Sequence, residues 1–101
     1  MNAESPGLYV IALIDIHDRD GYNNYIDGFR AIFSHYKGEL LVVEEKPAVI
    51  EGDWPFTRTV VVRFPDEAEA RRWYDSEDYQ NLAQLRFRSA HSRIIFAKGR
   101  N

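Results

Sequence analysis

The sequence predicts a single α+β domain whose strands and helices follow one another in the order β-α-β-β-α-β. Segments with strand periodicity alternate with segments of helical periodicity, and turn residues join the two central strand segments as a hairpin. The 101 residues match the usual length of one domain. Hydrophobic residues make up 45% and charged residues 29%, a balance typical of a folded chain.

The first strand and the first helix follow each other near the N-terminus. Residues 8–16 (LYVIALIDI) are apolar at nearly every position, which is typical of a central strand. From Tyr22 onward, aromatic and aliphatic residues recur at spacings of three and four as far as Tyr36, which predicts a helix. Asp18 or Asp20 is expected to cap its start, and Gly38 is expected to end it.

The central hairpin occupies the middle of the chain. Residues 39–45 (ELLVVEE) predict the second strand, with residues 48–51 as its continuation beyond Pro47. Residues 52–55 (GDWP) are typical of a turn. Residues 58–64 (RTVVVRF) predict the third strand.

The second crossover is expected to be a broken helix. Asp66, with Glu69 three residues later, resembles a capping box at the start of a short helix. Ser76 is a candidate cap for a second helical piece over about residues 78–90. The fourth strand is predicted over residues 91–98.

This order of elements leads to a ferredoxin-like fold. Right-handed crossovers and a central hairpin give an antiparallel sheet of order 4-1-3-2, with both helices on one face. The bare face would carry apolar residues of the first and third strands, so a homodimer through the sheet faces is expected. Residues 8–99 form the predicted domain, and residues 1–7 are expected to be a disordered tail.

One stretch of the sequence resembles a known family. Residues 51–86 (EGDWPFTRTVVVRFPDEAEARRWYDSEDYQNLAQLR) are similar to the DUF1330 family of domains of unknown function. The opening YVIALIDIHDRDGYNNY fits the same family, so the resemblance covers nearly the whole chain. It implies the dimeric α+β barrel fold, in which two ferredoxin-like sheets face each other. It implies no particular activity.

Charge and composition argue against several classes of partner and cofactor. The formal net charge is −3 with basic residues dispersed among acidic ones, so neither nucleic acid nor an anionic membrane is an expected partner. The absence of cysteine excludes disulfides, iron–sulfur clusters and a cysteine nucleophile. No metal and no cofactor is expected. Without a leader pattern at the N-terminus, a cytoplasmic location is expected.

Arg86 is the most informative single residue. It shares a helical stripe with apolar neighbours, among them Tyr79, Ala83 and Phe87, so it is expected to face the sheet. A buried arginine either pairs with a carboxylate or binds an anion in a cavity. Asp15 is the candidate carboxylate, and the two alternatives remain open.

The predicted topology brings further polar and aromatic residues to one end of the sheet. The end of the first strand lies beside the starts of the third and fourth strands, close to the first helix and the 52–55 turn. We therefore expect Tyr22, Tyr25, Trp54 and Arg58 to join Arg86 in a cleft between helices and sheet. Mostly apolar walls with a few polar groups are typical of a small-molecule site.

Three functions are compatible with this arrangement. The first is binding of a small polar or anionic metabolite in the cleft. The second is a cofactor-independent enzyme of the monooxygenase, isomerase or lyase type, with His17, His91 and Asp15 as weak candidates for acid–base residues. The third is a purely structural or interaction module, in which the same residues serve packing and dimerisation.

Overall fold

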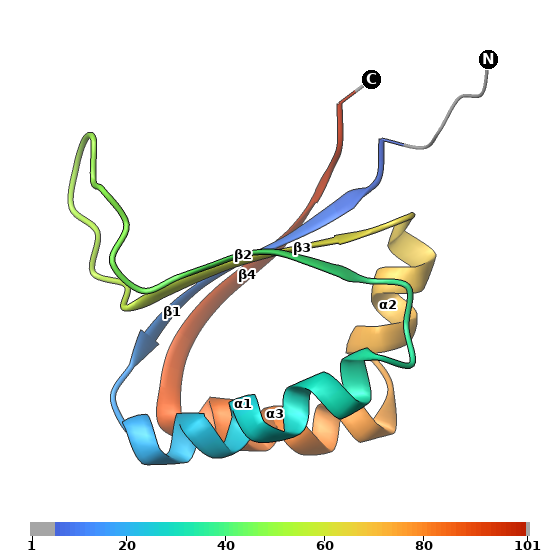
Figure 1. Cartoon of the computed structure of the whole chain (residues 1–101), viewed down its shortest axis with the longest axis horizontal. Coiled ribbons are helices and arrows are strands. Elements are labelled where there is room, and N and C mark those ends of the chain that lie inside the picture. The colour runs from blue at the N-terminus through green and yellow to red at the C-terminus, as the bar shows by residue number, and fades with distance from the viewer. Residues whose placement is uncertain (1–5, 101) are drawn as a thin grey trace.

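Strands and helices form two layers, an antiparallel sheet and a group of helices on one of its faces (Figure 1). The computed structural model describes residues 6–100. Most of the predicted tail, residues 1–7, lies outside this range; Gly7 is buried, and its carbonyl accepts a hydrogen bond from Gly99. The elements are β1 (Leu8–Ile16), α1 (Arg19–Phe33), β2 (Glu39–Glu44), β3 (Arg58–Phe64), α2 (Glu67–Tyr74), α3 (Glu77–Ser89) and β4 (Ala90–Lys98).

The sheet has the strand order β2-β3-β1-β4, which confirms the predicted 4-1-3-2 arrangement of a ferredoxin-like fold. All neighbouring strands are antiparallel. The central strand β1 places Ile14 opposite Arg58 of β3 on one side and opposite Ser92 of β4 on the other. A bulge between Leu40 and Val42 interrupts the pairing of β2 with β3.

The two faces of the sheet differ in what covers them. Burial alternates along β1, where Val10 and Ile14 are each 3% exposed beneath the helices. Their neighbours Ile11 and Leu13 are only partly buried, because side chains alternate between the faces of a strand. Figure 1 shows all helices on one face of the sheet and none on the other. We call the uncovered side the outer face.

The first helix begins at the predicted cap and ends earlier than expected. The Asp18 side chain accepts a hydrogen bond from the Gly21 amide at 3.1 Å. The helix stops at Phe33, not near Gly38, because the Ser34 hydroxyl donates back to the Ala31 carbonyl and the chain turns there. No helix within residues 6–100 is both long and apolar enough to span a membrane.

The second crossover is broken into two helices, as predicted. Asp66 caps α2 by accepting from the Glu69 amide at 2.9 Å, and Ser76 caps α3 by accepting from the Tyr79 amide at 3.1 Å. In a full capping box the Glu69 carboxylate would also accept a hydrogen bond from the Asp66 amide, and this bond is absent among these residues. The Glu69 carboxylate instead binds the Arg72 guanidinium and the Lys37 amide.

The predicted continuation of the second strand over residues 48–51 is wrong. The β2–β3 ladder ends where Glu44 meets Thr59, and residues 48–51 have no strand beside them. Residues 45–57 instead form a long connection that projects on the outer-face side of the sheet (Figure 1). We call residues 45–57 the arm. Its Ile50 side chain is 86% exposed.

Aromatic side chains fill the core beside α2. Trp73 is 4% exposed and stacks on Phe64 with the ring centroids 5.4 Å apart. Phe33 and Tyr79 contact the same indole from α1 and α3, at 5.9 and 4.4 Å. Away from this cluster, α1 lies against α3 and stands off from the sheet. The space between the helices and the sheet is only partly filled.

Candidate functional site

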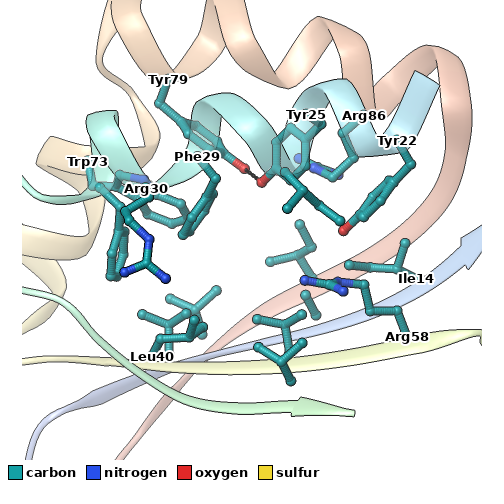
Figure 2. Close-up of a pocket in the computed structure, with 18 residues that line it drawn as sticks. Ile14, Tyr22, Tyr25, Phe29, Arg30, Leu40, Arg58, Trp73, Tyr79 and Arg86 are labelled. Carbon is teal, nitrogen blue, oxygen red and sulfur yellow. Dashed lines mark hydrogen bonds between the residues drawn. The ribbon is translucent and has the colours of Figure 1, made fainter. Parts of the chain in front are cut away.

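A cavity of about 480 Å³ lies between the helices and the inner face of the sheet (Figure 2). Its helical side is mainly aromatic, with side chains from α1, α2 and α3: Tyr22, Tyr25, Phe29, Trp73 and Tyr79. Its sheet side is aliphatic and includes Val10, Ala12, Ile14, Val60 and Val62. Arg30 and Leu40 also line it and are exposed, so the cavity opens to solvent beside α1 and β2. This volume lies within the usual range of small-molecule sites.

The periodicities of the elements explain which side chains reach the cavity. Tyr22, Tyr25 and Phe29 lie three and four residues apart and therefore share one face of α1. Every second residue of β1 faces the helices, which brings Ala12 and Ile14 to the cavity floor.

Two tyrosine hydroxyls form a hydrogen bond at the helical side of the cavity. The Oη atoms of Tyr25 and Tyr79 are 2.6 Å apart, and the residues are 7% and 1% exposed. Figure 2 shows these hydroxyls directed toward the cavity. Burial raises the pKa of both tyrosines, although the nearby Arg86 charge acts in the opposite direction. Both phenols are therefore neutral around neutral pH.

Arg86 is a buried cation without a carboxylate partner among residues 6–100. It is 3% exposed and lines the cavity, and its Nε and Nη2 atoms are buried without a hydrogen bond. The guanidinium carbon lies 5.8 Å from the Tyr25 ring centroid and 4.9 Å from that of Phe87. Cation–π contacts therefore replace an ion pair. Phe87 was expected on the same sheet-facing stripe, which is wrong: its side chain is 46% exposed, because adjacent helical residues do not share a face.

A second cation, Arg58, lines the cavity from the sheet side, on β3. Its Nη1 atom lies 2.8 Å from Glu45 Oε2, and the same carboxylate binds Arg19 at 3.2 Å. Hydrogen bonds from Arg19 and then Arg58 lower the pKa of Glu45. The Arg58 guanidinium also lies 5.5 Å from the ring centroid of Tyr22, whose pKa is raised by burial. Arg58 thus has a carboxylate partner, whereas Arg86 has none among the described residues.

A second hollow, of about 430 Å³, lies on the other side of Arg86. Its lining includes Tyr74, Phe87, His91 and Ser92. Arg86 and Ile94 line both spaces, so together they form part of the wall between them.

The structure brings four of the five expected ligand-binding residues together. Tyr22, Tyr25, Arg58 and Arg86 all line the main cavity. Trp54 does not line it: this residue lies in the arm, is 39% exposed and packs edge-on against Phe56 at 5.4 Å.

The three weak acid–base candidates lie away from the main cavity. Asp15 lies opposite His91 in the register of β1 and β4. It follows the inward-facing Ile14 by one residue, so its side chain is on the outer face of the sheet. The rings of His17 and His91 are 4.9 Å apart, and both residues are exposed. His91 reaches only the second hollow. Within residues 6–100, no three histidine, aspartate or glutamate side chains cluster so as to hold a metal ion.

Sequence reasoning did not include Tyr79 and Trp73 in the site. Tyr79 precedes Arg86 by seven residues, or two helical turns, and the sequence correctly predicted that it shares the face of Arg86. Its hydroxyl contact with Tyr25 was not foreseeable, because it depends on how α1 crosses α3. Trp73 lines the cavity from α2. Its buried Nε1 atom has no hydrogen-bond partner.

The lining groups define what the cavity can bind. Its polar side chains are tyrosines, arginines and the Trp73 indole, and no carboxylate or imidazole of residues 6–100 lines it. N–H groups only donate hydrogen bonds, so the cavity has a surplus of donors and of positive charge. Such a site favours a ligand that carries acceptor atoms or a negative charge on an apolar body.

Solved structures of similar fold come from several bacteria. A protein of unknown function from Rhodopseudomonas palustris is 14% identical and has a TM-score of 0.78, with 98% of this chain and 85% of that chain covered. A dimeric ferredoxin-like protein of unknown function from Thermobifida fusca is 16% identical over 91% of this chain and 90% of that chain, at a TM-score of 0.64.

SnoaB, a cofactor-independent oxygenase from Streptomyces nogalater, is 11% identical over 93% of each chain, at a TM-score of 0.66. At these identities the likeness concerns the fold alone. No curated protein sequence matches the chain. The model of a family described as a domain of unknown function, DUF1330, matches residues 7–100, as the sequence resemblance predicted. The chain therefore belongs to the DUF1330 family.

Proposed function

We propose that this protein binds a small molecule in the main cavity, with a largely apolar body and an anionic or hydrogen-bond-accepting group. The observation that carries this proposal is Arg86, a cation 3% exposed, without a carboxylate partner among the described residues, in the wall of an apolar cavity. A buried charge without a partner is costly to maintain. A ligand that supplies the opposite charge accounts for its presence.

The interaction-module alternative has less support. It expects Arg86 to pair with Asp15 and the space around it to be filled. Instead, Asp15 lies out of phase with the cavity-lining Ile14, and a cavity of about 480 Å³ adjoins Arg86.

The enzyme alternative expects an open pocket with a histidine facing Arg86. His91 and Arg86 line the second hollow together, but no histidine lines the larger, mostly apolar main cavity. Binding therefore has the stronger support. The oxygenase from Streptomyces nogalater shares only its fold with this chain, so its activity does not favour catalysis here.

The site is proposed to work within a homodimer. The outer face is uncovered by any helix, and it carries the partly buried Ile11 and Leu13 and the 57% exposed Ile95. An apolar sheet face of this kind is covered most simply by a second copy of itself. The dimeric description of the Thermobifida protein supports the same assembly.

Binding is tested by thermal shift and by tryptophan fluorescence. A ligand that binds only the native state raises the melting temperature by mass action. Trp73 lines the cavity and Trp54 does not, so a Trp54→Phe variant makes the fluorescence report on the cavity alone. A panel of aromatic acids, phenols and aliphatic acids should include compounds that shift both signals. No shift from any anionic compound contradicts the proposal.

A further inference from the structure

The Tyr25–Tyr79 pair has an unused hydrogen. The two hydroxyls are 2.6 Å apart, so one of them donates to the other. The second hydroxyl hydrogen remains free for another acceptor, since each tyrosine carries one. Both hydroxyls are directed toward the cavity (Figure 2), and the Arg86 guanidinium lies against the Tyr25 ring.

This arrangement resembles a preformed oxyanion site. Donors and positive charge held in an apolar, water-poor space stabilise negative charge on an oxygen, because they need no rearrangement when the charge arrives. We propose that the cavity selects the ionised form of a planar phenol or enol, with its oxygen against the Tyr25–Tyr79 hydroxyl pair and its ring between the aromatic and aliphatic walls. This inference rests on the proposed binding function and specifies its ligand class.

A phenolate or enolate fits the exposed donors better than a carboxylate does. A carboxylate has two oxygens and about four acceptor sites, which must all find donors once water is removed. The side of Arg86 that would grip it in a bidentate manner, Nε and Nη2, is buried. The hydroxyl pair offers one hydrogen at one point. A single ring-bound oxygen, with its charge spread over the ring, matches that geometry.

The shape of the cavity favours a flat ring. Its helical wall consists of aromatic rings, with Phe29 and Tyr25 at a centroid distance of 5.9 Å. The opposite wall is mainly aliphatic, with valine, alanine, isoleucine and leucine side chains of the sheet beside Arg58. Aromatic faces on one side and short aliphatic groups on the other form a slot for a planar body.

The charges that line the cavity favour the anion, although Glu45 behind Arg58 offsets part of the Arg58 charge. The titratable and charged groups lining the cavity are, on α1, Tyr22, Tyr25 and Arg30; on α3, Tyr79 and Arg86; and on β3, Arg58. None of them is acidic, and the tyrosines are neutral. No lining group accepts the proton of the phenol, so that proton passes to the buffer when the anion binds.

The experiment uses three probes of nearly equal size: para-nitrophenol, para-nitroanisole and para-nitrobenzoate. Ionised para-nitrophenol absorbs visible light and the neutral form does not, so its protonation in the cavity is read directly by titrating the saturated complex. We expect the bound phenol to ionise at least about one pH unit below the free phenol, a tenfold preference for the anion. Para-nitroanisole, which cannot ionise, should bind at least about tenfold more weakly at a pH where the phenol is ionised.

Variants identify the responsible groups. Tyr79→Phe and Tyr25→Phe should each move the titration midpoint of the bound phenol back toward that of the free phenol, and Arg86→Met should move it furthest. Arg88→Met is the matched control, because it removes the same charge from an exposed position of the same helix. It should leave the midpoint unchanged. The wild-type titration decides the question even where a variant folds poorly.

The outcomes separate this inference from the binding proposal. If the phenol binds but titrates at or above its free value, or binds no better than the anisole, selection of the ionised form is wrong while binding stands. If only para-nitrobenzoate binds, the site takes carboxylates, and the inference is overturned with binding again intact. If none of the three binds, both the inference and an aromatic ligand for the cavity are refuted.

Discussion

Asp15 and Arg86 lie on different sides of the sheet. Asp15 pairs with His91 in the register of β1 and β4, one residue beyond Ile14, which faces the helices. Arg86 projects from α3 into the space on the helical side. The carboxylate that sequence reasoning offered as a partner is therefore out of reach.

This separation gives the first prediction. Arg86→Met should change the free energy of unfolding by less than about 1.5 kcal/mol, because it removes a cation that is costly to bury and leaves no carboxylate unpaired. The same variant should lose binding of anionic ligands. Denaturant unfolding and the fluorescence titration measure the two effects, with Arg88→Met as control.

The double variant with Asp15→Asn should show additive effects, with a coupling energy below about 0.5 kcal/mol. A loss of roughly 3–5 kcal/mol on Arg86→Met, partly restored by Asp15→Asn, would mean that the two residues pair in solution and would remove Arg86 from the site.

Trp73 is predicted to be a major contributor to stability as well as a cavity wall. It is 4% exposed and contacts the rings of Phe64, Phe33 and Tyr79. Trp73→Ala should cost roughly 3–5 kcal/mol, the usual range for deleting a large buried aromatic side chain. Urea unfolding measures the loss. A value below about 1 kcal/mol, typical of surface changes, contradicts this packing.

The outer face is predicted to be the dimer interface. Light scattering should give about twice the 11.8 kDa chain mass. Ile95→Lys places a charge on a 57% exposed apolar residue of this face and should shift the protein toward the monomer. Asn24→Lys introduces the same charge on the exposed side of α1, away from the outer face, and should not. A wild-type protein that stays monomeric at micromolar concentration rules the interface out.

Glu69 is predicted to make stability depend on pH in the acid range. Two hydrogen bonds from Arg72 and one from the Lys37 amide, each 2.9 Å long, lower its pKa from 4.5 to about 2. A carboxylate with a lowered pKa in the folded state stabilises the fold above its unfolded pKa. The contribution of Glu69 should therefore be complete above pH 4.5 and disappear as pH falls toward about 2.

Urea unfolding of wild type and Glu69→Gln, from neutral pH downward, checks this. The difference between the two proteins should shrink with acidification. Glu67→Gln is the control for Glu69→Gln, because it removes a carboxylate of the same helix that makes only one ion pair, 3.3 Å long, with Arg71. A difference that grows as pH falls has the wrong sign for this mechanism.

Periodicity and capping residues were sufficient to predict the fold. The near-continuous apolar run of residues 8–16, the helical spacing after Tyr22 and the cap at Ser76 each reappear as an element of the structure. The end of α1 and the course of the arm were not predictable in the same way. They depend on local hydrogen bonds such as that of Ser34, and on the absence of a strand beside residues 48–51.

The site was predictable in part for a similar reason. Strand order determines which ends of the strands are neighbours, and this placed Tyr22, Tyr25, Arg58 and Arg86 together. It does not determine on which face a side chain lies. The two-residue period of β1 does, and it turns Asp15 away from the cavity once Ile14 faces inward.

The separation of α1 from the sheet bears on how firmly this helix is held. It rests on α3 and on aromatic side chains at the cavity wall, so part of its inner side faces the cavity and is not packed against the sheet. Local opening of such an element costs less free energy than opening of the sheet. A bound ligand would supply the missing contacts and act as part of the interior. Amide hydrogens of α1 should then exchange more slowly with solvent deuterium when the cavity is occupied, which would make this helix the segment that senses occupancy.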